Sequence, residues 1–545
     1  MSLDQSASGN EKVKLASSSD APLLKTSPSN KKNNLFKSTG TVSILTLLSR
    51  VLGLVRDVVL AHMIGASGMG DAFLVAFKIP NFMRRLFAEG AFAQAFVPVF
   101  SEVKTKGDLF AIRAFVSYVT GGLGSILLSL TLLGSIFSHY IIIVFAPGFL
   151  DHPEKLMLAG DLLRITFPYL LLISLTALSG SILNTYQLFS VSAFAPVILN
   201  VVLIISAYIG AHYFTEPVYA LAWGVLVAGA LQWMVHWPSL LKLQMFVKPR
   251  INFEQTDVKK IFALMLPALL SVSVSQISLL LDTIWASFLE TGSVSWLYYG
   301  DRLMELPLGM FGIAIGTVIL PTLSRKHASN SKASFSHTLN WALKLVLFLG
   351  LPSAVALAVL SEEILCSLFQ YGKFSWHDVQ MSANSLKAYS FGILAFMLVK
   401  VLAPGYFSRQ DTKTPVKAAI VAMIANMVLS FALMWPLNHV GLALATSLAG
   451  WVNALQLWFG LIKDRSLKME SDWFKFLFKL ILSACFMAAI LTIASPAEVV
   501  WREAHLYMRL LYLCAMVSLG CFIYFASLWV MGIRPRHLQL AADSD

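Results

Sequence analysis

Charged side chains inside long apolar segments are the residues of this sequence best able to do chemistry. A charge at the centre of a bilayer costs at least ~2.5–3.5 kcal/mol on insertion scales, so it normally faces a cavity and marks function. Apolar segments centred near residues 52, 85, 273 and 310 carry such charges. The candidate cavity residues are Arg50, Arg56, Asp57, Asp71, Lys78, Arg84, Arg85, Glu89, Asp282, Asp301, Arg302 and Glu305.

Basic residues outnumber acidic ones in the first two of these segments. An excess of cations in a shared cavity needs an anion, and the planar fork of arginine suits phosphate oxygens bidentately. We therefore predict an anionic substrate that carries a phosphate or pyrophosphate. The alternative is a set of structural salt bridges, since Asp57 lies close to the helix face of Arg50, and Glu89 lies one turn after Arg85.

Asp282 is the single acid of its apolar segment and is a candidate ligand for a coupling cation. Asn426, Ser430 and Thr446 could supply further oxygens if their helices pack against that segment. The alternative is an isolated carboxylate that hydrogen-bonds to Ser275, Gln276 or Ser278. No other metal site is predicted, because the four cysteines show no metal-ligand spacing.

Glycines and prolines interrupt the same segments, among them Gly53, Pro80, Pro307 and Gly309. Such residues are tolerated where backbone lines a cavity, and they let a helix bend during transport. Close packing between helices is an equally good interpretation of any one of them.

The composition requires lipid as the main solvent of the protein surface. Of the 545 residues, 57% are hydrophobic and 13% are charged, about half the usual ~25% of a soluble domain. The mean hydropathy is +0.72. The net charge of +12 lies between apolar segments, which indicates loop anchors rather than a nucleic-acid surface. No Walker, HExxH or GxSxG motif is present, so we predict a transporter rather than an enzyme and expect no cofactor.

The apolar runs predict an all-α polytopic membrane protein with about fourteen transmembrane helices. Lysine and arginine fall in every second loop except the uncharged one near Tyr186, for example Lys104 and Lys106. The intervening loops are poor in cations, apart from the short mixed one around Arg502. By the positive-inside rule, both termini are predicted to be cytoplasmic. Residues 1–34 carry no apolar run and are predicted to form a disordered cytoplasmic tail.

An internal repeat divides the apolar segments. Lys78-Ile79-Pro80 matches Glu305-Leu306-Pro307, and Leu199-Asn200-Val201 matches Ala425-Asn426-Met427, at an offset near 223 to 227 residues. Six spans per repeat make the two repeats parallel. The predicted parts are an N-lobe, a C-lobe, a helix pair outside the repeat and a short cytoplasmic tail, at residues 35–245, 246–465, 466–535 and 536–545.

Several strings jointly resemble the MurJ (MviN) family of the multidrug/oligosaccharidyl-lipid/polysaccharide exporter superfamily. They include Ser49-Arg50-Val51-Leu52-Gly53-Leu54-Val55-Arg56-Asp57, Arg84-Arg85-Leu86-Phe87-Ala88-Glu89-Gly90, Ala146-Pro147-Gly148-Phe149 and Ala403-Pro404-Gly405-Tyr406. The resemblance covers roughly residues 35 to 535. It implies a lipid II flippase with fourteen helices, two lobes around a cationic cavity, and a last helix pair that forms a groove for the lipid tail.

The resemblance also implies roles for individual residues. Arg50, Arg56, Arg84 and Arg302 would bind the pyrophosphate and headgroup of lipid II. Cavity support or gating would fall to Asp57, Asp71, Lys78, Arg85, Glu89, Asp301 and Glu305. Some members are thought to bind sodium near the position of Asp282, with a second acid one turn after the asparagine. This chain has Ser430 there, which departs from the family pattern.

The expected partners are lipid II and membrane lipids for a chain that acts as a monomer, with the cell-wall synthesis machinery as a further candidate. A sodium ion, a proton or the membrane potential would drive the cycle. Three alternatives stay open: a flippase for another polyprenyl-pyrophosphate-linked sugar, a multidrug antiporter, and a membrane glycosyltransferase. The arginines argue against a carrier of cationic drugs. The short outer loops argue against a glycosyltransferase, and a purely structural scaffold would not need buried arginines.

Overall fold

Every regular element in the described part of the chain is helical. The computed structural model describes residues 28–86, 92–329 and 331–534 of the 545. Glu89, the start of the predicted N-terminal tail and residues 536–545 lie outside these ranges. The first helix begins at Pro28, inside the stretch predicted to be the tail. Proline suits the first turn of a helix, where its missing N–H would have no partner, and no proline follows before Pro80.

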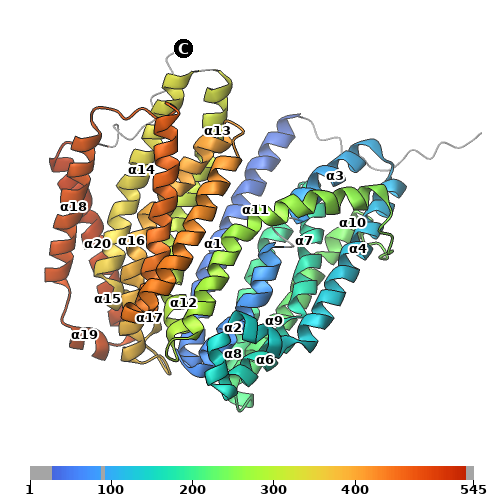
Figure 1. The fold of residues 1–545 in the computed structure, drawn as a ribbon, viewed down its shortest axis with the longest axis horizontal. Helices are drawn as coiled ribbons and strands as arrows, with labels where there is room; N and C mark the ends of the chain where they lie inside the picture. Colours follow the sequence, from blue (N-terminus) through green and yellow to red (C-terminus); the bar gives the residue numbers. More distant parts are fainter. Residues whose placement is uncertain (1–27, 87–91, 330, 535–545) are drawn as a thin grey trace, which may run out of the picture.

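The first half of the chain, up to residue 242, forms one group of helices (Figure 1). Its members are α1 (Pro28–Ile64), α2 (Gly68–Met83), α3 (Ala93–Lys106), α4 (Leu109–Ile136), α5 (Ser138–Phe145), the 3-10 helix η2 (Pro147–Asp151), α6 (Pro153–Thr166), α7 (Tyr169–Thr185), α8 (Phe189–Tyr213), α9 (Pro217–Met234) and α10 (Trp237–Lys242). In Figure 1, α1 lies at the edge of this group that faces the helices of the second half.

The second half of the chain, from residue 256 to residue 463, forms the opposite group. Its members are α11 (Thr256–Ser287), α12 (Ser293–Pro307), the π-helical segment η3 (Leu308–Gly312), α13 (Ile313–Ala328), α14 (Lys332–Val359), α15 (Ser361–Phe369), α16 (Trp376–Phe407) and α17 (Lys413–Lys463). Within α17 the backbone leaves the helical region at Asn438, with φ 50° and ψ −135°. α17 is therefore two helices that meet at this residue, and they match the two separate apolar runs of the sequence centred near residues 424 and 451.

The predicted spans match helical segments throughout the described ranges. Ten segments are long and apolar enough to cross a bilayer, with α17 counted once. α1 carries charges that count against a span by composition alone, and α2, with 16 residues, is short for a span. We call the end at which α1 starts and α20 (Leu506–Val530) stops the inner end, following the predicted orientation, and the opposite one the outer end.

Side-chain caps fix where several helices begin. The Ser67 side chain accepts a hydrogen bond from the backbone N–H of Gly70 at the start of α2, and Asp108 does the same for Ala111 in α4. A cap of this kind satisfies one of the unpaired N–H groups of the first turn. Gly65, between α1 and α2, has φ +60°, a conformation that other residues rarely adopt. The outer turn between the two charged helices is therefore tight.

α11 contacts both groups of helices, and in Figure 1 it crosses diagonally between them. Near its start, Lys260 forms an ion pair with Glu102 of α3 at 2.7 Å. Near its end, the Asn426 amide of α17 donates a hydrogen bond of 2.8 Å to Asp282. α11 therefore belongs to the second half by sequence and touches the first half at both ends, since the Ser287 hydroxyl at its outer end accepts a hydrogen bond of 3.0 Å from Gly148 of η2.

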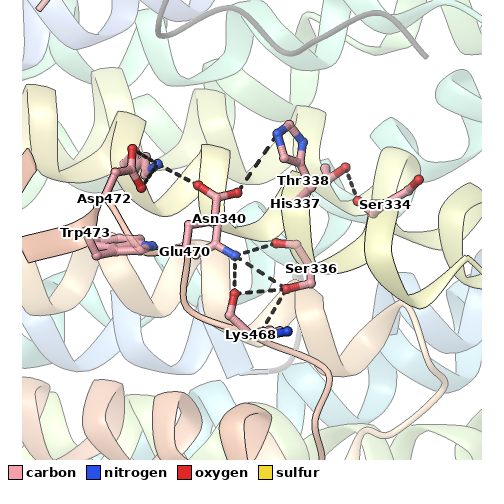
Figure 2. A network of polar contacts seen from close by, with 10 residues as sticks. Ser334, Ser336, His337, Thr338, Asn340, Lys468, Glu470, Asp472 and Trp473 are labelled. Atoms are coloured by element: carbon pink, nitrogen blue, oxygen red, sulfur yellow. Dashed lines mark hydrogen bonds and ion pairs between the residues drawn. The ribbon is translucent and has the colours of Figure 1, made fainter. Parts of the chain in front are cut away.

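The C-terminal pair, α18 (Trp473–Ala494) and α20, attaches to the second half at the inner end. Figure 2 shows the segment before α18 bound to α14. The Asn340 side chain donates to the carbonyl of Lys468 at 2.8 Å and accepts from the Trp473 indole at 2.6 Å. Lys344 forms ion pairs with Glu470 and Asp472.

The outer end of the pair is attached as well. The buried Arg509 guanidinium of α20 donates to the carbonyls of Cys366 and Gln370 after α15, at 3.2 Å each. The short helix α19 (Glu498–Glu503) joins α18 to α20 and packs on α15. Because both ends of the pair are held by α14 and α15, the pair must move with the second half.

Candidate functional site

A cavity of about 420 Å³ lies between the two halves. Its walls come from α1, α2, α8, α11, α12, α16 and α17. Eight of the predicted charged residues line it: Arg56, Lys78, Arg84, Arg85, Asp282, Asp301, Arg302 and Glu305. Five of these are basic and three are acidic, so the lining carries an excess of positive charge.

Asp57 forms ion pairs with two of the cavity arginines, Arg56 and Arg302. Its side chain is fully buried. One carboxylate oxygen accepts hydrogen bonds from Arg56 Nη2 at 2.6 Å and from the Tyr298 hydroxyl at 2.9 Å. The other oxygen forms an ion pair with Arg302 Nε at 2.7 Å. The carboxylate thus joins α1 of the first half to α12 of the second.

The partner of Asp57 differs from the one that sequence spacing favours. Arg50 lies near the same helix face, but Asp57 instead pairs with its immediate neighbour Arg56 and with Arg302 across the cavity. Arg56 donates to Asp57 through Nε and Nη2, and its Nη1 donates to Asn200 of α8 at 3.1 Å. Asn200 and Tyr298 were not predicted as site residues. The repeat signal at Asn200 was the only sequence feature that could have drawn attention to it.

Arg50 does not line the cavity. Its guanidinium lies against the backbone of Gly309 in η3. Within the described ranges, its side chain has no hydrogen bond or ion pair to protein. Arg302 also contacts Glu305, one turn further along α12, at 3.3 Å.

Asp71 lies outside the cavity and connects the halves at the outer end. It is fully buried and accepts four hydrogen bonds. Two come from the backbone N–H groups of Gly292 and Ser295, at 2.8 and 3.0 Å, and one from the Ser295 hydroxyl at 2.7 Å. The fourth comes from Lys155 of α6 at 2.9 Å. A carboxylate at the N-terminus of α12 is also stabilised by the helix dipole. Asp71 therefore joins α2 and α6 of the first half to the start of α12 in the second half.

At the inner end, the ion pair between Glu102 and Lys260 joins the halves, and it is more exposed than the contacts of Asp71. Glu102 and Lys260 are both exposed. Hydrogen bonds from Lys260 and Lys106 hold the pKa of Glu102 at about 2. A lowered carboxyl pKa gives stability that is present above the usual value and is lost as the pH falls toward the lowered one. This contact therefore stays charged at neutral pH and is not a pH switch.

The structure brings three of the four predicted cation-site residues together. Asp282 accepts hydrogen bonds from Asn426 at 2.8 Å and from Thr446 at 3.3 Å. Ser430, one turn after Asn426, is buried. In the described part of the chain, its hydroxyl oxygen and the Asn426 carbonyl oxygen have no hydrogen-bond partner. One carboxylate with neutral oxygens suits a hard monovalent cation, whereas no cluster of three metal-binding side chains occurs among the described residues.

Comparison with known proteins links this geometry to a family. A family model described as "Lipid II flippase MurJ" matches residues 60–513. A Vibrio cholerae protein named "Probable lipid II flippase MurJ" is 45% identical over 516 residues, which cover 93% of this chain and 98% of the relative. A solved structure named "Lipid II flippase MurJ, inward closed conformation" superposes with a TM-score of 0.77 at 30% identity, over 90% of this chain and 98% of that one.

A more distant solved structure has the same fold. It is an inward-facing multidrug-resistance transporter of the MATE family in the MOP superfamily, with a TM-score of 0.63 at 14% identity. The alignment covers 79% of this chain and 99% of the transporter. At this identity the likeness concerns the arrangement of helices alone.

Proposed function

Because this chain belongs to the MurJ family of lipid II flippases, we propose that it moves lipid II from the cytoplasmic to the outer leaflet of the inner membrane. The observation that carries the proposal is the cavity lined by Arg56, Arg84 and Arg302. Lipid II carries a pyrophosphate between its polyprenyl tail and its headgroup. Arginine binds the oxygens of such a group through paired, charge-assisted hydrogen bonds.

The buried carboxylate of Asp57 determines the charge balance of the cavity before the substrate binds. It offsets one of the two positive charges of Arg56 and Arg302 while no substrate is bound. A pyrophosphate carries more negative charge and can replace this carboxylate on the cavity side of both guanidinium groups. Asp57 then keeps the two like charges from repelling each other between transport cycles.

Movement of the two halves would complete the cycle. With the halves joined at the outer end by Asp71, lipid II would reach the arginines from the inner side, while its tail stays in the membrane. A cavity of about 420 Å³ is at the lower end of the range for drug-sized ligands, so the halves must separate further to admit the headgroup. Breaking the four bonds of Asp71 would then release lipid II outward.

The test of this function is the fraction of cellular lipid II exposed at the outer face after the protein is depleted. A periplasmic enzyme that cleaves only exposed precursor reports this fraction. We expect exposure to collapse on depletion, to return with the wild-type protein, and to stay low with Arg56→Ala, which removes an arginine of the cavity, at equal protein level. Unchanged exposure after depletion would mean that the chain moves another lipid, and a different polyprenyl-pyrophosphate-linked sugar would become the leading substrate.

A coupling cation at Asp282 is a separate part of the proposal. Sodium at about ten times its Kd should stabilise the purified wild-type protein by ~1.4 kcal/mol relative to choline, because only the folded site binds it. Asp282→Asn should remove this gain, whereas Asp301→Asn, which changes another acid of the same cavity, should keep it. Thermal unfolding in the two salts measures both. Equal sodium stabilisation of Asp282→Asn and wild type would rule out this site.

The orientation, the lobe boundaries at residues 245 and 465, and a monomeric state belong to the same proposal. The cation-rich loops around Lys106, Arg325 and Arg409 all lie at the inner end, which supports cytoplasmic termini. A reporter that fluoresces only in the cytoplasm, fused after residue 545, tests the orientation. Fluorescence would support it, and a dark fusion at full protein level would reverse it.

A further inference from the structure

Two glycines are in close contact with the guanidinium groups of two arginines, Arg302 and Arg50, that the family resemblance assigns to substrate binding. Arg302 of α12 lies over Gly53 of α1, and a Cβ atom built on Gly53 would be 2.5 Å from Arg302 Nη2. Arg50 of α1 lies over Gly309 of η3, where a Cβ atom would be 2.9 Å from Arg50 Cζ and closer still to Nη1. In each half of the chain, a glycine without a side chain therefore lets an arginine of the other half pack against its backbone.

The contacts of these glycines differ from those made by glycines that serve helix packing. A Cβ atom on Gly121 or Gly148 would meet a backbone carbonyl, that of Arg250 or of Ser287. Neither of those neighbours could move without moving a helix or a chain segment. Among the described glycines, Gly53 and Gly309 are the two whose added Cβ would meet a guanidinium group within 3 Å. A guanidinium at the end of a flexible side chain can move away while the fold stays intact.

The position of Arg50 depends especially on this fit. Its guanidinium has no hydrogen bond or ion pair within the described residues, so packing on Gly309 is the close contact that places it. Gly309 belongs to the π-helical segment η3, and such segments in α-helices often occur at functional sites. Arg302 has Asp57 as a second restraint, at 2.7 Å.

We propose that Gly53 and Gly309 are positioning residues for transport; this rests on the proposed function. Gly53 holds Arg302 at the cavity, and Gly309 holds Arg50, which lies outside the cavity in this state, where it meets the substrate's pyrophosphate once the halves separate. A side chain at either glycine displaces the arginine above it. The displaced guanidinium then makes poorer hydrogen bonds to the anion, although the protein is folded.

The experiment uses the full-length protein in nanodiscs, with undecaprenyl pyrophosphate as the probe. G53A and G309A are each expected to bind the probe about tenfold more weakly, the loss of one charge-assisted hydrogen bond. Their thermal midpoints should stay within about 2 °C of wild type, because only a side-chain end must shift. G124A is the matched control, since a Cβ atom there meets nothing within 4 Å, and it should bind like wild type.

Double mutants separate positioning from a general structural effect. If Gly309 acts through Arg50, G309A should cause no further loss of affinity in the R50A background, and G53A none in the R302A background. The proposal would be overturned if a glycine variant lost as much affinity in its arginine-variant background as in the wild-type background. It would also be overturned if the two single glycine variants bound the probe with wild-type affinity. Should either alanine variant fail to fold, a serine variant with the same readouts replaces it, and unfolding of both would assign the glycine to packing and overturn the proposal there.

The substrate is tested separately through transport of lipid II by the wild-type protein. If lipid II is not moved but the glycine variants weaken probe binding as expected, the proposed function fails and the positioning role stands. If lipid II is moved and the glycine variants bind the probe like wild type, the proposed function stands and the positioning role fails.

Discussion

Asp57→Asn is expected to abolish transport and to lower thermal stability more than any other single change in the cavity. The substitution removes the one negative charge between Arg56 and Arg302, which both contact it. Removing one partner of a buried ion pair typically costs ~3–5 kcal/mol, because the remaining charge is left without compensation. Here two guanidinium groups would also face each other. Exposure of lipid II at the outer face should fall to the level of depleted cells.

Thermal unfolding of purified protein and the lipid II exposure assay measure the two effects of Asp57→Asn. Glu102→Gln is the matched control, because Glu102 is also paired with two cations but is exposed. Exposed ion pairs contribute little, so this variant should behave like wild type in both assays. Normal lipid II exposure with Asp57→Asn would mean that the arginines need no internal counter-charge.

Asp71→Ala should open the outer end of the protein. It leaves the Lys155 ammonium, only 9% exposed, without its carboxylate, and it removes the acceptor from the first turn of α12. A loss of ~3–5 kcal/mol from the outer-closed state would change the population ratio of closed to open at least a hundredfold. Transport should fall because the state that receives lipid II from the inner side becomes rare.

Chemical labelling from outside measures this opening. Phe77→Cys places a thiol in the cavity of a chain whose four natural cysteines have been replaced. Reaction with a membrane-impermeant maleimide should be at least tenfold faster in the Asp71→Ala background. Ser295→Ala, which removes one of the four hydrogen bonds, should give a smaller increase. Equal labelling rates in all three backgrounds would show that Asp71 does not control the outer end.

The location of the cavity could be predicted from the sequence because lipid makes buried charge rare. Eight charged residues in four apolar segments converge on one cavity, as the cost of charge in a bilayer requires. The spans were equally predictable, since a bilayer fixes how long an apolar run must be. The break at Asn438 lies between two such runs, one centred near residue 424 and the other near residue 451.

The partners of those charges could not be predicted. Asn200 and Tyr298 are polar residues in apolar segments, and nothing in the local sequence separates them from residues that only pack. Adjacent helix positions do not face each other, so spacing rules gave no hint that Arg56 bends back to Asp57. Lys155 lies in an outer segment poor in cations, and its contact with Asp71 depends on how α6 packs against α2.

α11 has a thermodynamic consequence that follows from its contacts with both halves. One end of the helix holds Asp282 beside Asn426, and the other holds Lys260 against Glu102. If an ion at Asp282 favours one arrangement of this helix by some factor, that arrangement must bind the ion more tightly by the same factor. Ion affinity measured in protein locked at either end would therefore report the free-energy difference between the two arrangements without any transport assay.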